Sequence, residues 1–334
     1  MIDVARPFGE RTGAVRFKEP PNGPQLRVEY MPREHATRPG AWKKMHAGEV
    51  DIDEALVERL LAAQFPHLAG LPISAVKSTG TVNAIYRLGD SLCTRLPRVA
   101  AWAQGVENEM TWLPKLAPSL SLRVPEPVAR GRPARGYPFP WAIFRWIDGL
   151  PYRDDLVHDE RQAARDLAQF VTELRRIELG GAPPGGRKPL RELDAVTRAA
   201  IESSRGVIDA AAAAAAWTSA LEAPAWDGTP VWIHSDLLRP NLLVDRGRLC
   251  AVIDFGGVGA GDPAADVIAA WSVFGPDGRA MLPDALDVDD GTWSRARGYA
   301  LHQAVLVIPY YAETNPGFVA LAKRTVEEVL AGTE

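Results

Sequence analysis

From residue 231 to residue 266 the chain reads VWIHSDLLRPNLLVDRGRLCAVIDFGGVGAGDPAAD, and the strongest evidence for fold and chemistry lies in this segment. One apolar, strand-like run ends in His234 and Asp236, and Asn241 follows five residues after Asp236. A second apolar run ends in Asp254. Polar side chains at adjacent strand ends can converge on one point, so the segment predicts a polar site built from two strand ends.

Transfer of a phosphoryl group needs such a cluster. One carboxylate must orient or deprotonate the attacking hydroxyl, and an amide oxygen and a second carboxylate must hold Mg²⁺ against the phosphates. Mg²⁺ prefers oxygen ligands and is usually held by one or two carboxylates together with substrate phosphates. Asp236 fits the first role, and Asn241 and Asp254 fit the second.

The order of these residues matches two kinase signatures, H-x-D-x-x-x-x-N followed by D-F-G. Either signature alone is common by chance, but both occur here in order, each at the end of an apolar run. The alternative, two capping aspartates and a turn, is the weaker interpretation. No A-P-E segment follows residues 254–256, which disfavours a protein kinase.

The same segment resembles the aminoglycoside phosphotransferase family, which also includes macrolide kinases and choline-kinase-like relatives. The family pattern is approximately H-G-D-L-H-x-x-N-L-L, then I-D-F/W, then G-D-P-x-x-D. The matching positions are His234, Asp236, Leu237, Asn241, Leu242, Leu243, Ile253, Asp254, Phe255, Gly261, Asp262, Pro263 and Asp266. Ser235 stands where glycine is usual and Leu238 where histidine is common, but neither departure removes an expected ligand.

The resemblance covers about residues 50–330 and implies an α+β, protein-kinase-like bilobal fold, with a small β-rich N-terminal lobe and a larger, mainly helical C-terminal lobe. Residues 1–44 are expected to be a polar tail without a core of its own, a composition that permits disorder, and Met45 is a candidate natural start. Residues 45–147 are expected to form the nucleotide-binding lobe and residues 148–334 the catalytic and acceptor-binding lobe. A chain of 334 residues exceeds the usual size of one core, in agreement with two lobes.

Apolar periodicity predicts strands at residues 73–76, 84–88, 91–96, 141–147, 231–233 and 250–253, and helices at residues 53–65, 106–116, 161–177, 210–216, 295–308 and 318–330. The Pro- and Gly-rich residues 180–189 are expected to form a surface loop. The two cysteines, Cys93 and Cys250, lie in apolar runs and are expected to be core thiols, not a disulfide framework.

In the resembling family the small lobe holds the nucleotide, and the hinge that contacts its base follows the last strand. This position corresponds here to residues 144–148, so the resemblance assigns base recognition to the backbone of Arg145, Trp146 and Ile147. A loop nearer the N-terminus is a candidate cover for the phosphates through its N–H groups, although its single glycine fits a plain hairpin turn equally well. That loop contains Ser78, Thr79 and Gly80.

Arg95 occupies the place of the strand lysine in the kinase signature V-A-I-K. Its planar, permanently charged guanidinium is suited to phosphate oxygens, and an exposed strand arginine is the alternative. Glu109 is the candidate partner that orients Arg95, because it shares a helix face with apolar residues, and Glu107 is the other possibility.

His234, Asp262 and Asp266 are candidate supports of the catalytic loop. For the two aspartates helix capping is the favoured interpretation, because Asp262 precedes Pro263, a good first helical residue.

The sequence predicts least about the acceptor. An acidic stretch follows the hinge and would attract a polycation, with a solvated surface as the alternative. Its candidate acceptor-binding residues are Asp154, Asp155, Asp159 and Glu160.

A net charge of -4 disfavours nucleic acid as a partner. No apolar run reaches the ~18 residues of a membrane-spanning helix, and the N-terminus lacks the apolar segment of a secretory signal. We therefore expect a cytoplasmic protein whose partners are a nucleotide and a small molecule, with no membrane and with the oligomeric state left open.

The expected activity is Mg²⁺-dependent transfer of the terminal phosphoryl group of ATP or GTP to a hydroxyl of a small molecule. The resemblance, more than the residues, favours an aminoglycoside antibiotic, and a macrolide or another hydroxylated metabolite is the alternative. A catalytically silent, nucleotide-binding pseudokinase is the second class of function. The presence of Asp236, Asn241 and Asp254 argues against it.

Overall fold

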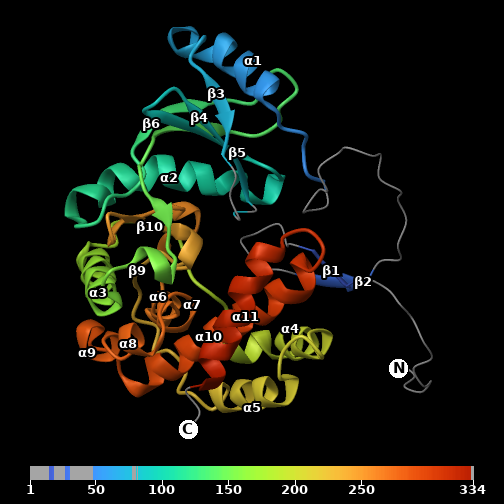
Figure 1. The fold of residues 1–334 in the computed structure, drawn as a ribbon, viewed down its shortest axis with the longest axis vertical. Helices are drawn as coiled ribbons and strands as arrows, with labels where there is room; N and C mark the ends of the chain where they lie inside the picture. The colour runs from blue at the N-terminus through green and yellow to red at the C-terminus, as the bar shows by residue number, and fades with distance from the viewer. Residues whose placement is uncertain (1–14, 19–26, 31–47, 77–79, 81, 332–334) are drawn as a thin grey trace.

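The computed structural model describes residues 15–18, 27–30, 48–76, 80 and 82–331. It confirms the expected α+β class, since a small lobe built on a five-stranded sheet stands on a larger, mainly helical lobe (Figure 1). The polar tail expected at residues 1–44 lies outside the described residues, apart from two short strands. These strands, β1 (Val15–Lys18) and β2 (Arg27–Tyr30), pair antiparallel, and the sequence pattern carries no signal for them.

The sheet of the small lobe is antiparallel throughout, in the order β3-β4-β5-β7-β6. Its strands are β3 (Ile73–Ala75), β4 (Asn83–Leu88), β5 (Leu92–Pro97), β6 (Pro127–Gly131) and β7 (Trp141–Arg145). The sequence predicts all of these except β6. That strand begins with a proline and lies at the edge of the sheet, where proline is tolerated but weakens a strand signal.

Side chains alternate across each strand, so the sheet has two buried faces. In β7, Trp141 and Ile143 belong to one core cluster, whereas Ala142 and Phe144 belong to the other. The first face is covered by α1 (Glu54–Gln64), whose buried leucines pack in the same cluster as Trp141. The second face is turned toward the large lobe.

The helix α2 (Ala103–Leu116) covers this second face and links the two lobes. Its side chains Val106 and Leu113 are buried and join the core cluster that continues through the large lobe. Gly105 lies against Gly256 of the large lobe, where a Cβ on Gly105 would be 3.3 Å from the Gly256 Cα. The missing side chains therefore let the helix backbone approach the large lobe closely.

The large lobe consists mainly of helices, with two small sheets in the orders β11-β10-β8 and β12-β9. Its long helix α10 packs against α4, α5, α6 and α11. The helices are α3 (Glu160–Arg176), α4 (Leu190–Ser203), α5 (Ala210–Ala220), α6 (Ala264–Val267), α7 (Ala269–Ser272), α8 (Pro276–Arg279), α9 (Leu282–Leu286), α10 (Asp290–Tyr311) and α11 (Pro316–Ala331). The strands are β8 (Leu150–Pro151), β9 (Val231–Ile233), β10 (Leu242–Asp245), β11 (Arg248–Val252) and β12 (Gly259–Gly261). None of the described helices has both the length and the apolar character needed to cross a bilayer.

The two strands that lead into the predicted site do not share a sheet. β9 pairs with β12, and β11 pairs with β10. Their ends meet because the buried His234 side chain, just after β9, is hydrogen bonded to the Ile253 carbonyl, just after β11, at 3.0 Å. A side-chain contact, and not the strand adjacency expected from the sequence, brings the two ends together.

Residues 183–187, here called the strap, lie along β12 and are more than the surface loop expected from their composition. The Ala260 N–H donates to the Pro183 carbonyl at 2.7 Å, and the Gly185 N–H donates to the Ala260 carbonyl at 2.9 Å. A Cβ on Gly261 would lie 2.6 Å from the Gly185 carbonyl oxygen. Glycine in both segments therefore permits this approach, which carries the end of the strap toward the catalytic loop.

We predict that Gly261→Ala destabilises the large lobe, because the added methyl group would meet the backbone of Gly185 and push the strap away from β12. Overpacking of this kind costs about 1–3 kcal/mol and should lower the Tm in thermal unfolding. Ala260→Ser is the control, because its partly exposed side chain lies on the opposite side of the strand. A wild-type Tm for Gly261→Ala would contradict the close packing.

Candidate active site

The loop after β9 carries Asp236, the candidate base, and Asn241 holds it. Asn241 Nδ2 donates to Asp236 Oδ2 at 2.8 Å and to the Asp236 backbone carbonyl at 2.9 Å. Because the amide nitrogen is used in this way, the amide oxygen of Asn241 is left for another ligand. Two of the three residues at the centre of the predicted site are therefore in direct contact.

His234 is buried beneath this loop. Its Nδ1 accepts the Asp236 N–H at 3.2 Å, so its Nε2 carries the proton that is donated to the Ile253 carbonyl. Phe255 packs edge-on against the imidazole, with the ring centroids 4.6 Å apart. The imidazole thus connects the catalytic loop to the strand end that carries Asp254.

The Asp266 carboxylate holds the turn of the catalytic loop. Its Oδ2 accepts the His234 N–H at 2.9 Å, and its Oδ1 accepts the Ser235 N–H at 2.7 Å. Ser235 has a φ of 69°, in the left-handed region that favours glycine, which explains why the family pattern has glycine at this position. The carboxylate of Asp266 therefore binds the loop and does not make the helix cap that was the favoured interpretation.

Asp262 does form the expected cap. Its Oδ1 accepts the Ala264 N–H at 2.9 Å at the start of α6. Arg295 of α10 also donates to both carboxylate oxygens of Asp262, at 2.9 and 3.2 Å. The contact of Asp262 with the catalytic loop is therefore indirect, through the placement of α6, which carries Asp266.

A buried network connects Asp254 to the small lobe. Arg95 of β5 donates from Nη2 to Asp254 Oδ1 at 2.7 Å and from Nη1 to Glu109 of α2. Glu109 also accepts the Phe255 N–H at 2.8 Å, whereas Glu107 pairs with a different arginine. Arg95 is buried, so it is not the exposed strand arginine of the alternative interpretation.

The surroundings shift the pKa values of the two central carboxylates, Asp236 and Asp254, in opposite directions. Burial and the charge of Asp254 raise the pKa of Asp236, while Arg187 opposes this. Burial also acts to raise the pKa of Asp254, but Arg95 outweighs it and holds that pKa below its usual value. Burial raises the pKa of Glu109 to about 7, although Arg95 opposes this. Asp254 is therefore ionised at neutral pH, as a cation ligand must be.

The donor atoms at the site fit Mg²⁺. Asn241 Oδ1 and Asp254 Oδ2 are not used in the hydrogen bonds to Asp236 and Arg95, and both are oxygen donors of the kind that Mg²⁺ takes. Within the described ranges, no group of three His, Cys, Asp or Glu side chains is placed to hold a metal. The protein would thus supply one amide and one carboxylate oxygen, and phosphate oxygens and water would complete the shell.

Comparison with known proteins agrees with this geometry. The family model of the phosphotransferase enzyme family matches residues 77–299, which is more than half of the chain. The chain belongs to this family. The resemblance inferred from residues 231–266 is therefore confirmed.

The relatives of this phosphotransferase are distant in sequence. The uncharacterized protein YcbJ of Bacillus subtilis (strain 168) is 26% identical to this chain over 191 residues. The match covers 53% of this chain and 60% of YcbJ, which is less than two thirds of that relative. The chain is similar to the GDP and kanamycin complex of APH(2")-IIia, with a TM-score of 0.67 and 19% identity over 83% of this chain and 99% of the other. It is also similar to macrolide 2'-phosphotransferase type I, with a TM-score of 0.54 and 19% identity over 82% of this chain and 98% of the other. These likenesses confirm the kinase-like bilobal fold.

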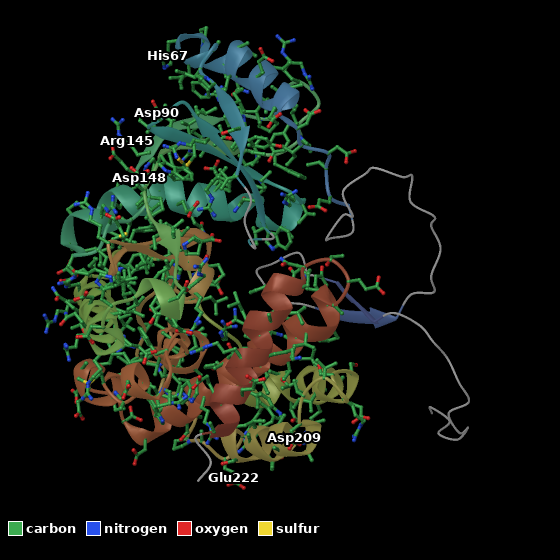
Figure 2. All side chains as sticks on the ribbon, in the orientation of Figure 1. His67, Asp90, Arg145, Asp148, Asp209 and Glu222 are labelled. Carbon is green, nitrogen blue, oxygen red and sulfur yellow. The ribbon has the colours of Figure 1, made fainter. Side chains whose placement is uncertain are left out.

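The predicted hinge, residues 144–148, follows β7, and Figure 2 labels Arg145 and Asp148 beside the sheet. The Arg145 N–H donates to the Glu126 carbonyl at 2.9 Å, and the Trp146 N–H donates to the Ser91 carbonyl at 2.8 Å. The Ile147 N–H has no protein acceptor in the described part of the chain. Of the three predicted hinge residues, Ile147 is therefore the one whose N–H is left for a base.

The predicted phosphate-covering loop is only partly described. Ser78 and Thr79 lie outside the described residues, and Gly80 is exposed. Their predicted contact with phosphates stays a prediction.

The acidic residues after the predicted hinge have partners within the large lobe. Asp154 makes a bidentate ion pair with Arg239, at 2.6 and 3.0 Å. Asp155 pairs in the same way with its neighbour Arg153, at 2.6 and 2.9 Å. Both carboxylates are thus already neutralised within the large lobe.

The other two acidic residues serve helix ends. Asp159 caps α3 by accepting the Gln162 N–H at 3.0 Å. Glu160 accepts two glycine N–H groups at α8, at 2.6 and 3.0 Å. Each of the four residues thus has a partner within the large lobe, and their assignment to acceptor binding stays a prediction.

Two residues that lie outside every sequence signature contact the site. Gln303 of α10 donates from Nε2 to Asp236 Oδ1 at 2.9 Å. Arg187, at the end of the strap, donates to Gln303 Oε1 at 2.6 Å and to the Ser235 carbonyl at 3.2 Å. Sequence reasoning missed both, since a single glutamine in a long helix and an arginine in a Pro- and Gly-rich loop carry no signal of what they will contact.

We predict that Asp266→Asn loosens the catalytic loop. Asparagine has one acceptor oxygen and an amide nitrogen that would face a backbone N–H, so the N–H of either His234 or Ser235 loses its acceptor. An unsatisfied buried donor costs about 1–3 kcal/mol, which should lower the Tm. Asp245→Asn, at the exposed end of β10, is the matched control. Equal Tm values for both variants would contradict the role of Asp266 in holding the loop.

Proposed function

We propose that this phosphotransferase moves the terminal phosphoryl group of ATP or GTP to a hydroxyl of a small molecule. The observation that carries the proposal is the environment of Asp236, which is held by Asn241 and lies near an ionised Asp254 that is paired with Arg95. This arrangement combines a base, two cation ligands and a fixed positive charge, which are the parts that phosphoryl transfer uses. The same intact set argues against a silent pseudokinase.

The reaction begins with the acceptor hydroxyl hydrogen bonded to the Asp236 carboxylate. Its oxygen attacks the terminal phosphorus while Asp236 takes its proton, and the bond from that phosphorus to the bridging oxygen breaks to release the nucleoside diphosphate. The raised pKa of Asp236 makes it a better proton acceptor than an exposed aspartate. Bound Mg²⁺, held by Asn241 and Asp254, would neutralise the charge of the phosphates.

The small lobe supplies a fixed charge and the contact to the base. Arg95 is fixed by Glu109, so its guanidinium keeps a permanent positive charge at the phosphate side of the site. At the hinge, the Ile147 N–H is suited to adenine N1 and to guanine O6, since both are acceptors. The GDP bound in the complex of APH(2")-IIia supports GTP as one donor to test.

An aminoglycoside is the first acceptor to test. The support for it is the family membership, together with the kanamycin that is bound in the complex of APH(2")-IIia. On this proposal the biological role is resistance to such an antibiotic.

A macrolide or another hydroxylated molecule with less positive charge is the second candidate. It is favoured by the charges around the site, because the four acidic residues after the hinge have internal partners and the cation Arg187 is hydrogen bonded to Gln303, which contacts Asp236. Likeness to macrolide 2'-phosphotransferase type I gives it further support.

We predict that the purified chain turns over nucleotide with Mg²⁺ and that Asp236→Ala does not. ATP and GTP are tested separately against kanamycin, a macrolide and a set of hydroxylated metabolites. Loss of a general base lowers kcat by about 10²–10⁴-fold, whereas nucleotide affinity should stay unchanged, since Asp236 acts on the acceptor. Asp245→Ala is the control and should behave as wild type.

Three outcomes discriminate between the candidates. Turnover stimulated by kanamycin alone identifies an aminoglycoside kinase, and stimulation by the macrolide or a metabolite identifies the second candidate. Nucleotide binding without turnover toward any of these acceptors would favour the pseudokinase. Undiminished turnover by Asp236→Ala would overturn the assignment of the base.

A further inference from the structure

We infer that Gln303 and Arg187 are positioning residues that align the Asp236 carboxylate with the acceptor hydroxyl, an inference that rests on the proposed function of Asp236. The two residues come from α10 and from the strap, far apart in the sequence, and they form one chain of hydrogen bonds that ends at Asp236.

The direction of this chain follows from the chemistry of its members. A guanidinium has N–H donors and no acceptor, so Arg187 must face the amide oxygen of Gln303. The amide nitrogen of Gln303 is thereby turned toward Asp236, to which it donates at 2.9 Å. The carboxylate of Asp236 accepts only, so it favours the same orientation of the amide. Arg187 therefore reinforces this orientation and fixes the position of the Gln303 side chain.

The carboxylate of Asp236 is held at both oxygens. Gln303 donates to Oδ1, and Asn241 donates to Oδ2. Two donors from different segments set the plane of the carboxylate, and each oxygen keeps a further lone pair for a hydroxyl proton. In a reaction that depends on alignment, a displacement of about 1 Å costs about 100-fold in rate. A second donor on Asp236 is thus expected to act on turnover more than on binding.

Arg187 is an unusual residue to find in this place. It is partly buried, its Nε is buried with no hydrogen-bond partner in the described part of the chain, and its two hydrogen bonds go to neutral oxygens, an amide oxygen and a backbone carbonyl. A desolvated cation held by neutral oxygens is costly, so its retention needs a reason beyond stability. The strap brings it here by packing on β12, and its second hydrogen bond, to the Ser235 carbonyl, ties it to the turn that precedes Asp236.

The test compares Gln303→Leu, Gln303→Glu, Arg187→Met and Arg187→Lys with wild type. Kanamycin is the acceptor probe, replaced by the most active compound of the panel if kanamycin is not phosphorylated. We expect Gln303→Leu to lower kcat by about 10- to 100-fold, with the nucleotide Kd and the acceptor KM within about twofold of wild type. Gln303→Glu is expected to be at least as damaging, because a second carboxylate cannot donate to Asp236.

Because Arg187 acts on Asp236 through Gln303, we expect two further results. Arg187→Met and Gln303→Leu should not add in the double variant, because both remove the same alignment. Arg187→Lys keeps a cationic donor and should recover part of the loss. Gln169→Leu, an exposed glutamine of α3, is the matched control for loss of a helical amide and should keep wild-type kcat.

A purely structural role gives a different pattern. In that case Gln303→Leu would lower the Tm and would reduce the residual turnover of Asp236→Ala as well, whereas alignment of Asp236 predicts no further loss in that background. Either this pattern or a wild-type kcat in Gln303→Leu overturns the inference. If Asp236→Ala itself turns over as wild type, the proposed role of Asp236 as the base fails first. If Asp236→Ala is inactive and Gln303→Leu is not impaired, only the positioning inference fails.

Discussion

The rest of the site depends on two hydrogen bonds from the backbone of the catalytic loop to the buried carboxylate of Asp266. They fix the turn at His234 and Ser235, where the backbone enters the left-handed region without glycine. Such a conformation costs about 1–3 kcal/mol and persists only where the surroundings hold it. The direction in which Asp236 leaves the loop follows from this turn. Every contact that Asp236 makes therefore depends on the backbone turn that Asp266 holds.

The second constraint couples the two lobes. Arg95 lies between Glu109 of α2 and Asp254 of the large lobe, and Glu109 also binds the Phe255 N–H. A permanently charged guanidinium between two carboxylates keeps Asp254 ionised, and the contact of Gly105 with Gly256 places α2 close enough for this network to form. The same side chains therefore set the position of the small lobe and the charge state of Asp254, the proposed cation ligand.

The acceptor side of the site is built from different parts. The acidic residues after the predicted hinge cap or bind helix ends and make two ion pairs. Outside the family pattern, the side chain that reaches Asp236 is Gln303 of α10, and Arg187 of the strap holds the amide of Gln303. Substrate choice in this phosphotransferase is therefore expected to depend on the surfaces of these two segments, whereas the phosphate side follows the family pattern.

Local order along the chain was enough to predict the candidate site, because Asp236, Asn241 and Asp254 lie at fixed spacings within one segment and their residue types indicate its chemistry. The same holds for α1, α2 and most strands of the small lobe, whose apolar periods are strong. Other features depended on tertiary packing. β6 begins with a proline at a sheet edge. Helix capping was the favoured interpretation of Asp266, but its carboxylate binds the backbone of the loop. The four acidic residues after the predicted hinge have partners within the large lobe. Gln303 of α10 reaches Asp236 directly, and Arg187 reaches Gln303 because close glycine contacts let the strap pack on β12. The spacing of residues within one segment predicts which of their side chains can form a site together. Contacts between segments far apart in the chain depend on how whole helices and strands pack, which local spacing does not determine.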